Sequence, residues 1–329
     1  MHRAGNLLGT FLLAWLLGWT PRILAQSNEV HILPRSSSAA ALTGEGASPS
    51  FSSAIRKDVD LVLVPVTITD LTGRLVRGLD KDNFQIFEGK HRQEIRHFSN
   101  EDTPVSVGII LDTSGSMHSK LDRAREAVME FCRTANPRDE FFLITFSDAP
   151  LLAVDFTSHV EDLEGALIIS RGKGHTALLD AVYLGLAKMR EAEYERRALL
   201  IISDGGDNRS RYTANEIKPL LKESDVQLYA AGIYDRDVRT EEELRGPQLL
   251  GELAGLTGGR DFILDNVNQL PAMAQAISVA LRSQYVLAYQ PENSPHDGKW
   301  HKIRVRLKIP HGGTFLHISA KNGYYAAGR

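Results

Sequence analysis

Cysteine is almost absent from this sequence, which holds one, Cys132, among 329 residues. A single thiol cannot form a disulfide within the chain, and it cannot supply the several thiolates of a zinc or iron–sulfur centre. The helical pattern places Cys132 beside Phe131 on an apolar face, which indicates a buried, inert thiol rather than a nucleophile. Stability must therefore come from the burial of apolar side chains.

The sequence also lacks an excess of positive charge, since 38 Lys and Arg residues face 41 Asp and Glu residues, for a net charge of −3. Without a bulk positive field we expect no nucleic-acid partner. Hydrophobic residues make up 43% of the chain, and 27 Gly and 13 Pro accompany them, which excludes collagen-like, coiled-coil and wholly disordered chains. A soluble globular protein remains, and its length allows two domains.

Long hydrophobic runs are missing too, because the apolar stretch from Leu7 to Trp19 falls short of the roughly 20 residues that a spanning helix needs. That stretch follows His2 and Arg3 and has the length of a signal-peptide core. We therefore expect residues 1–25 to be a cleaved export signal, with an uncleaved membrane anchor as the alternative. The mature protein would be periplasmic or extracellular, and residues 26–57, rich in Ser, Ala, Gly and Pro, would form a flexible linker.

The two ends of the remaining chain, residues 58–103 and residues 283–329, share the alternating apolar pattern of half-buried strands. The strand candidates are residues 58–69, 84–86, 94–98, 285–289, 303–309 and 315–319. About three strands in each segment could not be stable separately, because isolated hairpins are marginal in water. We therefore predict one small β-sandwich-like domain built from both chain ends, called the β-domain below.

Residues 104–282 follow a different pattern, in which short unbroken apolar runs alternate with segments of helical period. The runs are Val107–Leu111, Phe141–Phe146, Ala198–Ile202 and Val226–Ile233. Continuous apolarity indicates strands covered on both faces, as in a parallel sheet between two layers of helices. We predict a doubly wound, mostly parallel, Rossmann-like α/β domain inserted into the β-domain.

Polar residues stand where these strands are expected to end. The first run leads into Asp112, Ser114 and Ser116, a later loop carries Thr176, and the third run leads into Asp204. Because ligand sites in open α/β sheets lie beyond the carboxyl ends of the strands, we expect these side chains at one sheet edge. The alternative is that the serines only cap a helix and the aspartate only ends a strand.

This combination resembles the von Willebrand factor type A domain with its metal-ion-dependent adhesion site. Asp112, Ser114 and Ser116 match the family's Asp-x-Ser-x-Ser element, Thr176 matches its second-loop threonine and Asp204 its third-loop aspartate. The resemblance implies that the hydroxyls bind a divalent ion directly, that the aspartates bind it directly or through water, and that a partner's carboxylate completes the coordination. Such an oxygen set favours Mg²⁺ or Mn²⁺ over Ca²⁺.

Motifs outside the metal set extend the resemblance to a secreted bacterial family of this domain, over about residues 58–325. They are the closing Tyr285-x-Leu287-x-Tyr289-x-Pro291 together with Asp297-Gly298 and Lys321-Asn322-Gly323-Tyr324.

The sequence thus predicts an exported binding module rather than an enzyme, one that captures a protein partner presenting an acidic side chain. Association with the cell envelope fits such a module. Lys173 and His175 flank the expected metal loop and either tune the choice of ligand or have no role. Asp207 and Asn208 either support Asp204 or only shape the turn after it.

One alternative is Mg²⁺-dependent phosphoryl transfer of the haloacid dehalogenase type, with Asp204 and Asp207 holding the metal. This alternative is disfavoured because enzymes of that type resemble one another in an Asp-x-Asp-x-Thr motif at the first loop. This chain has Ser114 and Ser116 where the second aspartate and the threonine of that motif would stand.

The other alternative is binding of envelope glycan by aromatic residues of the β-domain, although core packing explains most of these residues equally well. The candidates are Tyr285, Tyr289, Trp300, Tyr324 and Tyr325. A basic stripe in the same domain indicates either a solvated face or a contact with an anionic surface. It consists of Lys302, Arg304, Arg306 and Lys308.

Overall fold

The structure is a computed structural model that describes residues 61–329 apart from residues 205, 235–240, 292–296, 309–314 and 327–329. The expected export signal and linker lie outside the described residues. None of the helices within the described ranges is long and apolar enough to cross a membrane.

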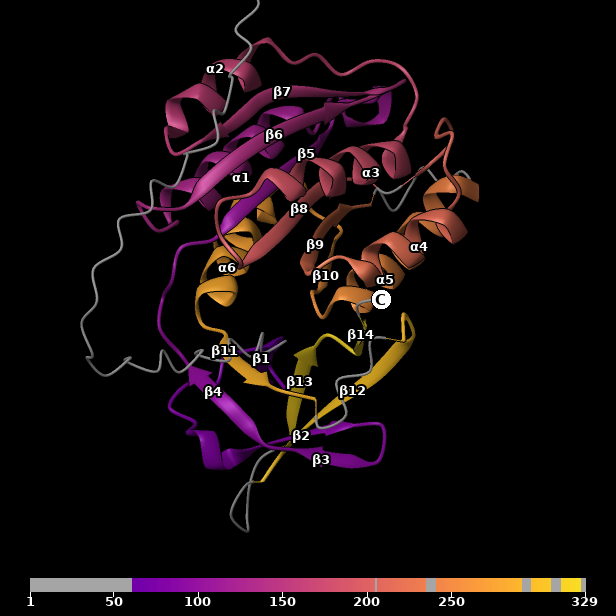
Figure 1. The fold of residues 1–329 in the computed structure, drawn as a ribbon. Helices are drawn as coiled ribbons and strands as arrows, with labels where there is room; N and C mark the ends of the chain where they lie inside the picture. The colour runs from indigo at the N-terminus through magenta and orange to yellow at the C-terminus, as the bar shows by residue number, and fades with distance from the viewer. Residues whose placement is uncertain (1–60, 205, 235–240, 292–296, 309–314, 327–329) are drawn as a thin grey trace, which may run out of the picture. The chain divides into compact units, whose positions relative to one another are not determined.

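A six-stranded sheet forms the centre of the α/β domain (Figure 1). Its strand order is β10-β9-β8-β5-β6-β7, and all neighbours are parallel except β6 and β7, which are antiparallel. In chain order, the strands are β5 (Ser106–Asp112), β6 (Glu140–Phe146), β7 (Pro150–Thr157), β8 (Arg197–Ser203), β9 (Val226–Ile233) and β10 (Asp261–Leu264). The predicted mostly parallel sheet is confirmed.

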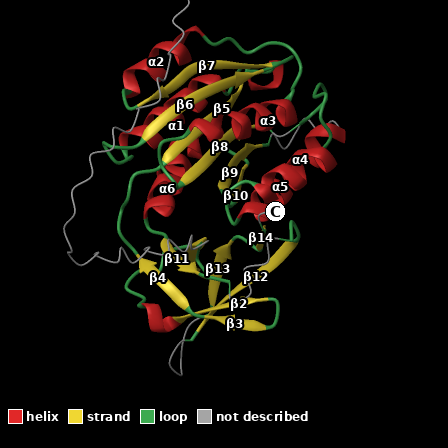
Figure 2. Ribbon diagram, in the orientation of Figure 1, coloured by secondary structure: helices red, strands yellow, loops and turns green. Residues whose placement is uncertain are grey.

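Helices α1 to α6 cover both faces of this sheet (Figure 2). They are α1 (Leu121–Arg133), α2 (Val160–Ile169), α3 (Leu178–Lys188), α4 (Ala214–Glu223), α5 (Glu241–Thr257) and α6 (Leu270–Arg282). The apolar core on one face includes α1, α2 and α6, and the core on the other includes α3, α4 and α5. Along β6, Phe141 belongs to the first core and Phe142 to the second, which explains why the apolar runs are unbroken.

Two strands of this sheet, β7 and β10, were not expected, although each contains a short apolar run. β7 is an edge strand whose residues are mostly half-buried, and it begins with Pro150. An edge strand has no second neighbouring strand on its outer side, so the N–H that proline lacks is not needed there. β10, at the opposite edge, has four residues and keeps Ile263 exposed.

The β-domain consists of two four-stranded sheets, in the orders β13-β1-β11-β4 and β14-β12-β2-β3. The strands are β1 (Val62–Asp70), β2 (Phe84–Glu88), β3 (His91–Gln93), β4 (Ile95–Ser99), β11 (Tyr285–Tyr289), β12 (Trp300–Leu307), β13 (Leu316–Ala320) and β14 (Gly323–Tyr325). Strand β1 pairs with both β11 and β13, so a strand from the amino-terminal part lies between two from the carboxyl-terminal part. This confirms a domain built from both chain ends. The strand predicted at residues 315–319 corresponds to β13, and it was expected to be the last strand, but β14 follows it.

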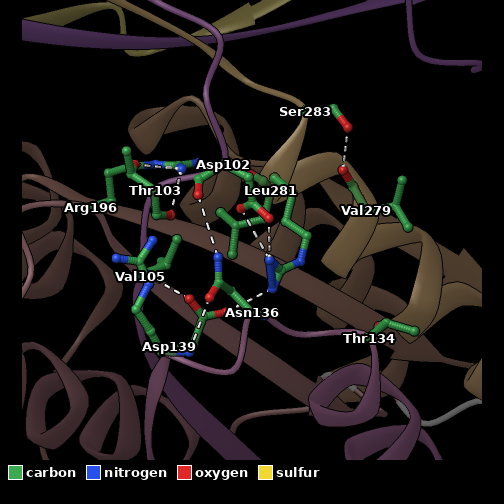
Figure 3. A network of polar contacts seen from close by, with 12 residues as sticks. Asp102, Thr103, Val105, Thr134, Asn136, Asp139, Arg196, Val279, Leu281 and Ser283 are labelled. Carbon is green, nitrogen blue, oxygen red and sulfur yellow. Dashed lines mark hydrogen bonds and ion pairs between the residues drawn. The ribbon is translucent and has the colours of Figure 1, made fainter.

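A polar network ties together the two connections between the domains (Figure 3). Arg282, at the end of α6, donates to Asp102 Oδ2 at 2.9 Å and to Asp139 Oδ2 at 2.8 Å. Arg196 donates to the carbonyl of Thr103 at 3.0 Å and also to the carbonyl of Leu281. Because Asp139 is 3% exposed, burial raises its pKa, and hydrogen bonds from backbone amides and the charge of Arg282 oppose that rise. The entry to and exit from the α/β domain are thus held to one another.

Candidate metal centre

The candidate site lies where β5 and β8 end. These strands are parallel neighbours, with Leu111 beside Ile202, so Asp112 and Asp204 reach the same edge of the sheet. Three loops meet there: residues 113–120 after β5, residues 170–177 before α3 and residues 204–213 after β8. This is the edge at which open α/β sheets bind their ligands.

Asp112 is fully buried, and both of its carboxylate oxygens accept hydrogen bonds. Oδ1 accepts from the backbone N–H of Ser114 at 2.8 Å, and Oδ2 accepts from the hydroxyl of Ser203 at 2.6 Å. Burial, followed by the negative charge of Asp204, raises the pKa of Asp112 to about 7, although these hydrogen bonds oppose the rise. The edge therefore holds a carboxylate whose charge is poorly compensated.

Ser114 and Ser116 bring two hydroxyls to the same loop. Their Oγ atoms lie 3.1 Å apart, with Ser114 only 1% exposed and Ser116 open to solvent. The loop folds tightly because residues Gly115–Met117 form one turn of 3₁₀ helix, which precedes α1. The first loop thus offers one carboxylate and two hydroxyl oxygens.

Thr176 is held in place by backbone contacts to the other loops. Its N–H donates to Asn208 Oδ1 at 2.9 Å, and its carbonyl accepts from the N–H of Asn208 at 3.1 Å. The second loop also meets the first, because the N–H of Gly115 donates to the carbonyl of Gly174 at 3.0 Å. These contacts place Thr176 between the first and third loops, where it is 5% exposed.

Asp204 is 4% exposed and faces a lysine that the sequence analysis did not single out. The ammonium of Lys120, just before α1, lies 3.1 Å from Asp204 Oδ2. Burial raises the pKa of the nearby Tyr234 phenol, and the charges of Asp204 and Asp261 raise it further. Within the described residues the Tyr234 hydroxyl has no hydrogen-bond partner. Lys120 thus partly neutralises Asp204, whereas Asp112 forms no ion pair within the described residues.

The donor set fits a hard divalent cation. Among the described residues only Asp204 of the two carboxylates pairs with an ammonium, that of Lys120, and the hydroxyls of Ser114 and Ser116 stand on the loop after Asp112. Mg²⁺ and Mn²⁺ prefer such oxygen ligands. Over the ranges that the structure describes, no three His, Cys, Asp or Glu side chains gather into a metal-binding cluster, so any centre here depends on the hydroxyls.

Two residues left open by the sequence connect the loops. Asp207 Oδ2 accepts from the N–H of Leu179, at the start of α3, at 2.9 Å, and from the hydroxyl of Ser210 at 2.7 Å. Asn208 holds the backbone of Thr176, as described above. Both residues support the arrangement of the loops. Ser203, which binds Asp112, carries no signal in the sequence beyond its place before Asp204.

Lys173 and His175 are exposed at the rim of the site. The N–H and Nδ1 of His175 each lie 3.0 Å from Asp148 Oδ1. These hydrogen bonds and the adjacent positive charges lower the pKa of Asp148. Lys173 touches the first loop through its backbone, since its N–H donates to the carbonyl of Thr113 at 2.9 Å.

Of the aromatic residues that were candidates for a glycan-binding face, two belong to the core instead. Tyr285 is 2% exposed and Tyr289 is fully buried, because both lie on the inner face of β11 in the apolar core. Trp300 and Tyr325 form an edge-to-face pair with ring centroids 5.1 Å apart, and Tyr325 is 38% exposed. Cys132 is buried as expected, and burial raises the pKa of its thiol to about 12.

A family model described as the von Willebrand factor type A domain matches residues 107–206. Inter-alpha-trypsin inhibitor heavy chain H4 from Bos taurus is 28% identical over 136 residues, which cover 38% of this chain and 14% of that protein. The chain therefore spans only a small part of this curated relative.

Solved structures show similarity at low sequence identity. The von Willebrand factor type A protein from Catenulispora acidiphila is 12% identical, with a TM-score of 0.49, over 82% of this chain and 75% of that one. The BatB protein from Bacteroides thetaiotaomicron is 21% identical, with a TM-score of 0.44, over 54% of this chain and 100% of that one. The part of the chain that matches the von Willebrand factor type A domain is thus residues 107–206, which lie within the α/β domain described above.

Proposed function

We propose that this protein is an exported binding module that captures a protein partner through a divalent ion, Mg²⁺ or Mn²⁺, at the sheet edge described above. The observation that carries the proposal is the convergence of three loops on the buried Asp112, with Asp204 and the serine hydroxyls beside it. The proposed ligands are Asp112, Ser114, Ser116, Thr176 and Asp204.

The bound ion would act as an electrophile that accepts a carboxylate from the partner. The residues of this chain prepare that step. Burial of Asp112 and its charge repulsion with Asp204 favour a cation, and the exposed Ser116 keeps one side of the edge open to solvent. The match of residues 107–206 to the von Willebrand factor type A domain supports an interaction module rather than an enzyme.

Calorimetric titration of Mg²⁺ and of Mn²⁺ into the chelator-treated protein tests the proposal. We expect one saturable site in the parent and weaker binding in Asp112→Ala and Thr176→Ala. Asp122→Asn, which changes a carboxylate that is 94% exposed on α1, is the matched control and should bind the metal as the parent does.

Native circular dichroism spectra of all variants must first show that they fold. If the parent binds neither metal at millimolar concentration, or if the control weakens binding as much as Asp112→Ala does, the proposed metal site is wrong.

A further inference from the structure

Four exposed basic residues stand on the two loops that flank the candidate metal centre. They are Arg171 and Lys173 on the second loop and Arg209 and Arg211 on the third, and they are called the basic rim below. The backbones of two of them touch the site, because the N–H of Lys173 donates to the carbonyl of Thr113 and the N–H of Arg209 to the carbonyl of Thr176, at 2.9 and 3.2 Å. The other two lie two residues from these along the chain.

Ion pairs do not neutralise the basic rim, although the charge of Arg209 acts on the exposed Asp148. Within the described residues none of the four forms an ion pair. The exposed carboxylates nearby already face other cations, since Asp148 contacts His175 and Asp122 contacts Arg125. An unpaired group of four cations is notable in a chain with a net charge of −3.

Uncompensated charge beside a binding site raises the local concentration of ligands of opposite sign and disfavours those of like sign. At physiological ionic strength this attraction extends over about 8 Å, so it acts on residues flanking the one that enters the site. A ligand with a single carboxylate would leave the basic rim unused.

We propose that the partner presents a segment with several acidic residues. One carboxylate would enter the metal centre, and its neighbours on either side would meet Arg171 and Lys173 on one loop and Arg209 and Arg211 on the other. The inference rests on the proposed function, because it assigns the partner of the same site.

Two synthetic peptides of about 12 residues serve as probes. One carries five Glu residues spaced by Gly and Ser, and the other carries a central Glu with Gln at the other four positions. Fluorescence anisotropy measures the affinity of each for the parent, with Mg²⁺ and with chelator. The rim variant replaces Arg171, Lys173, Arg209 and Arg211 with Gln, which removes exposed side chains only.

The β12 strand offers a matched control. Lys302, Arg304, Arg306 and Lys308 are also exposed, so replacing them with Gln removes the same charge at a distant place in the fold. Circular dichroism and thermal melting establish that both variants fold.

With Mg²⁺ present, we expect the rim variant to bind the five-Glu peptide about tenfold more weakly than the parent, because several exposed charge pairs each contribute a small part of the affinity. This loss should be smaller in high salt, which screens exposed charges. Its affinity for the one-Glu peptide should change less than about threefold, and the β12 variant should bind both as the parent does.

Four results would overturn the inference: absence of five-Glu binding, equal losses for both peptides, equal losses in both variants, or a sulfated oligosaccharide that binds the rim more tightly without Mg²⁺. The chelator arm separates this failure from that of the proposed function. If chelator leaves the peptide affinity unchanged, the metal-dependent capture is refuted. If binding needs Mg²⁺ but the rim variant binds as the parent does, only the acidic-segment inference is refuted.

Discussion

The substitution Asp112→Asn measures how much the buried negative charge of Asp112 destabilises the folded protein when no metal is bound. The side chain of Asp112 has no exposed surface, and its pKa of about 7 lies well above the usual value of 3.8 for Asp. Asparagine has nearly the same shape. Its carbonyl oxygen can accept from the N–H of Ser114, and its amide can donate to the Oγ of Ser203, so that both contacts are kept although the second one reverses its direction.

The sign of the effect follows from proton linkage. Because the folded pKa is raised, the folded state holds the proton more tightly than the unfolded state between pH 3.8 and about pH 7, and stability falls as pH rises through that window. The full penalty above the folded pKa is about 4 kcal/mol, from a shift of roughly three units at 1.36 kcal/mol each. Near pH 5 the penalty is only about 1.7 kcal/mol, so the pH dependence itself is about 2.6 kcal/mol between pH 5 and pH 8.

Urea unfolding in the presence of chelator, followed by circular dichroism, measures this difference. We expect Asp112→Asn to be more stable than the parent at pH 8, with the gain shrinking by about 2.6 kcal/mol towards pH 5. Asp122→Asn is the matched control, because its side chain is 94% exposed, and it should follow the parent at every pH. Parallel pH profiles for the parent and Asp112→Asn would refute the reasoning, as would a variant that is less stable at pH 8.

Three further changes test other parts of the structure. Arg282→Met should lower the free energy of unfolding, measured in urea, by about 3 kcal/mol, because it leaves the buried carboxylate of Asp139 without its ion pair. Arg123→Met breaks the more exposed pair with Glu126 and should lower it by less than about 1 kcal/mol. Equal losses in the two variants would contradict the argument. Gly174→Ala, at φ +89° with a Cβ 2.7 Å from a carboxylate oxygen, should lower the melting temperature more than Gly78→Ala, at φ +80° in open space, and the reverse order would be inconsistent with the loop geometry. Cys132 should react with a thiol reagent only in denaturant, so stoichiometric labelling of the folded protein would show that the thiol is accessible.

The central strands could be predicted from the sequence because a strand covered on both faces must be apolar at every position. Ala198–Ile202 shows this, since successive side chains enter different cores. The outer strands had weaker signals. β7 lies at an edge, where it begins with Pro150 and its apolar run is mostly half-buried, and β14 is only three residues long.

The sequence by itself determined which residue types reach the carboxyl edge of the sheet, because Asp112 and Asp204 directly follow strands that must run parallel. Only the tertiary structure decided their surroundings. Lys120 faces Asp204, and Ser203 donates to Asp112, through contacts that join residues more than 80 positions apart, and no local pattern encodes such pairs. Burial, the cause of the raised pKa of Asp112, likewise exists only when the helices have packed onto both faces of the sheet.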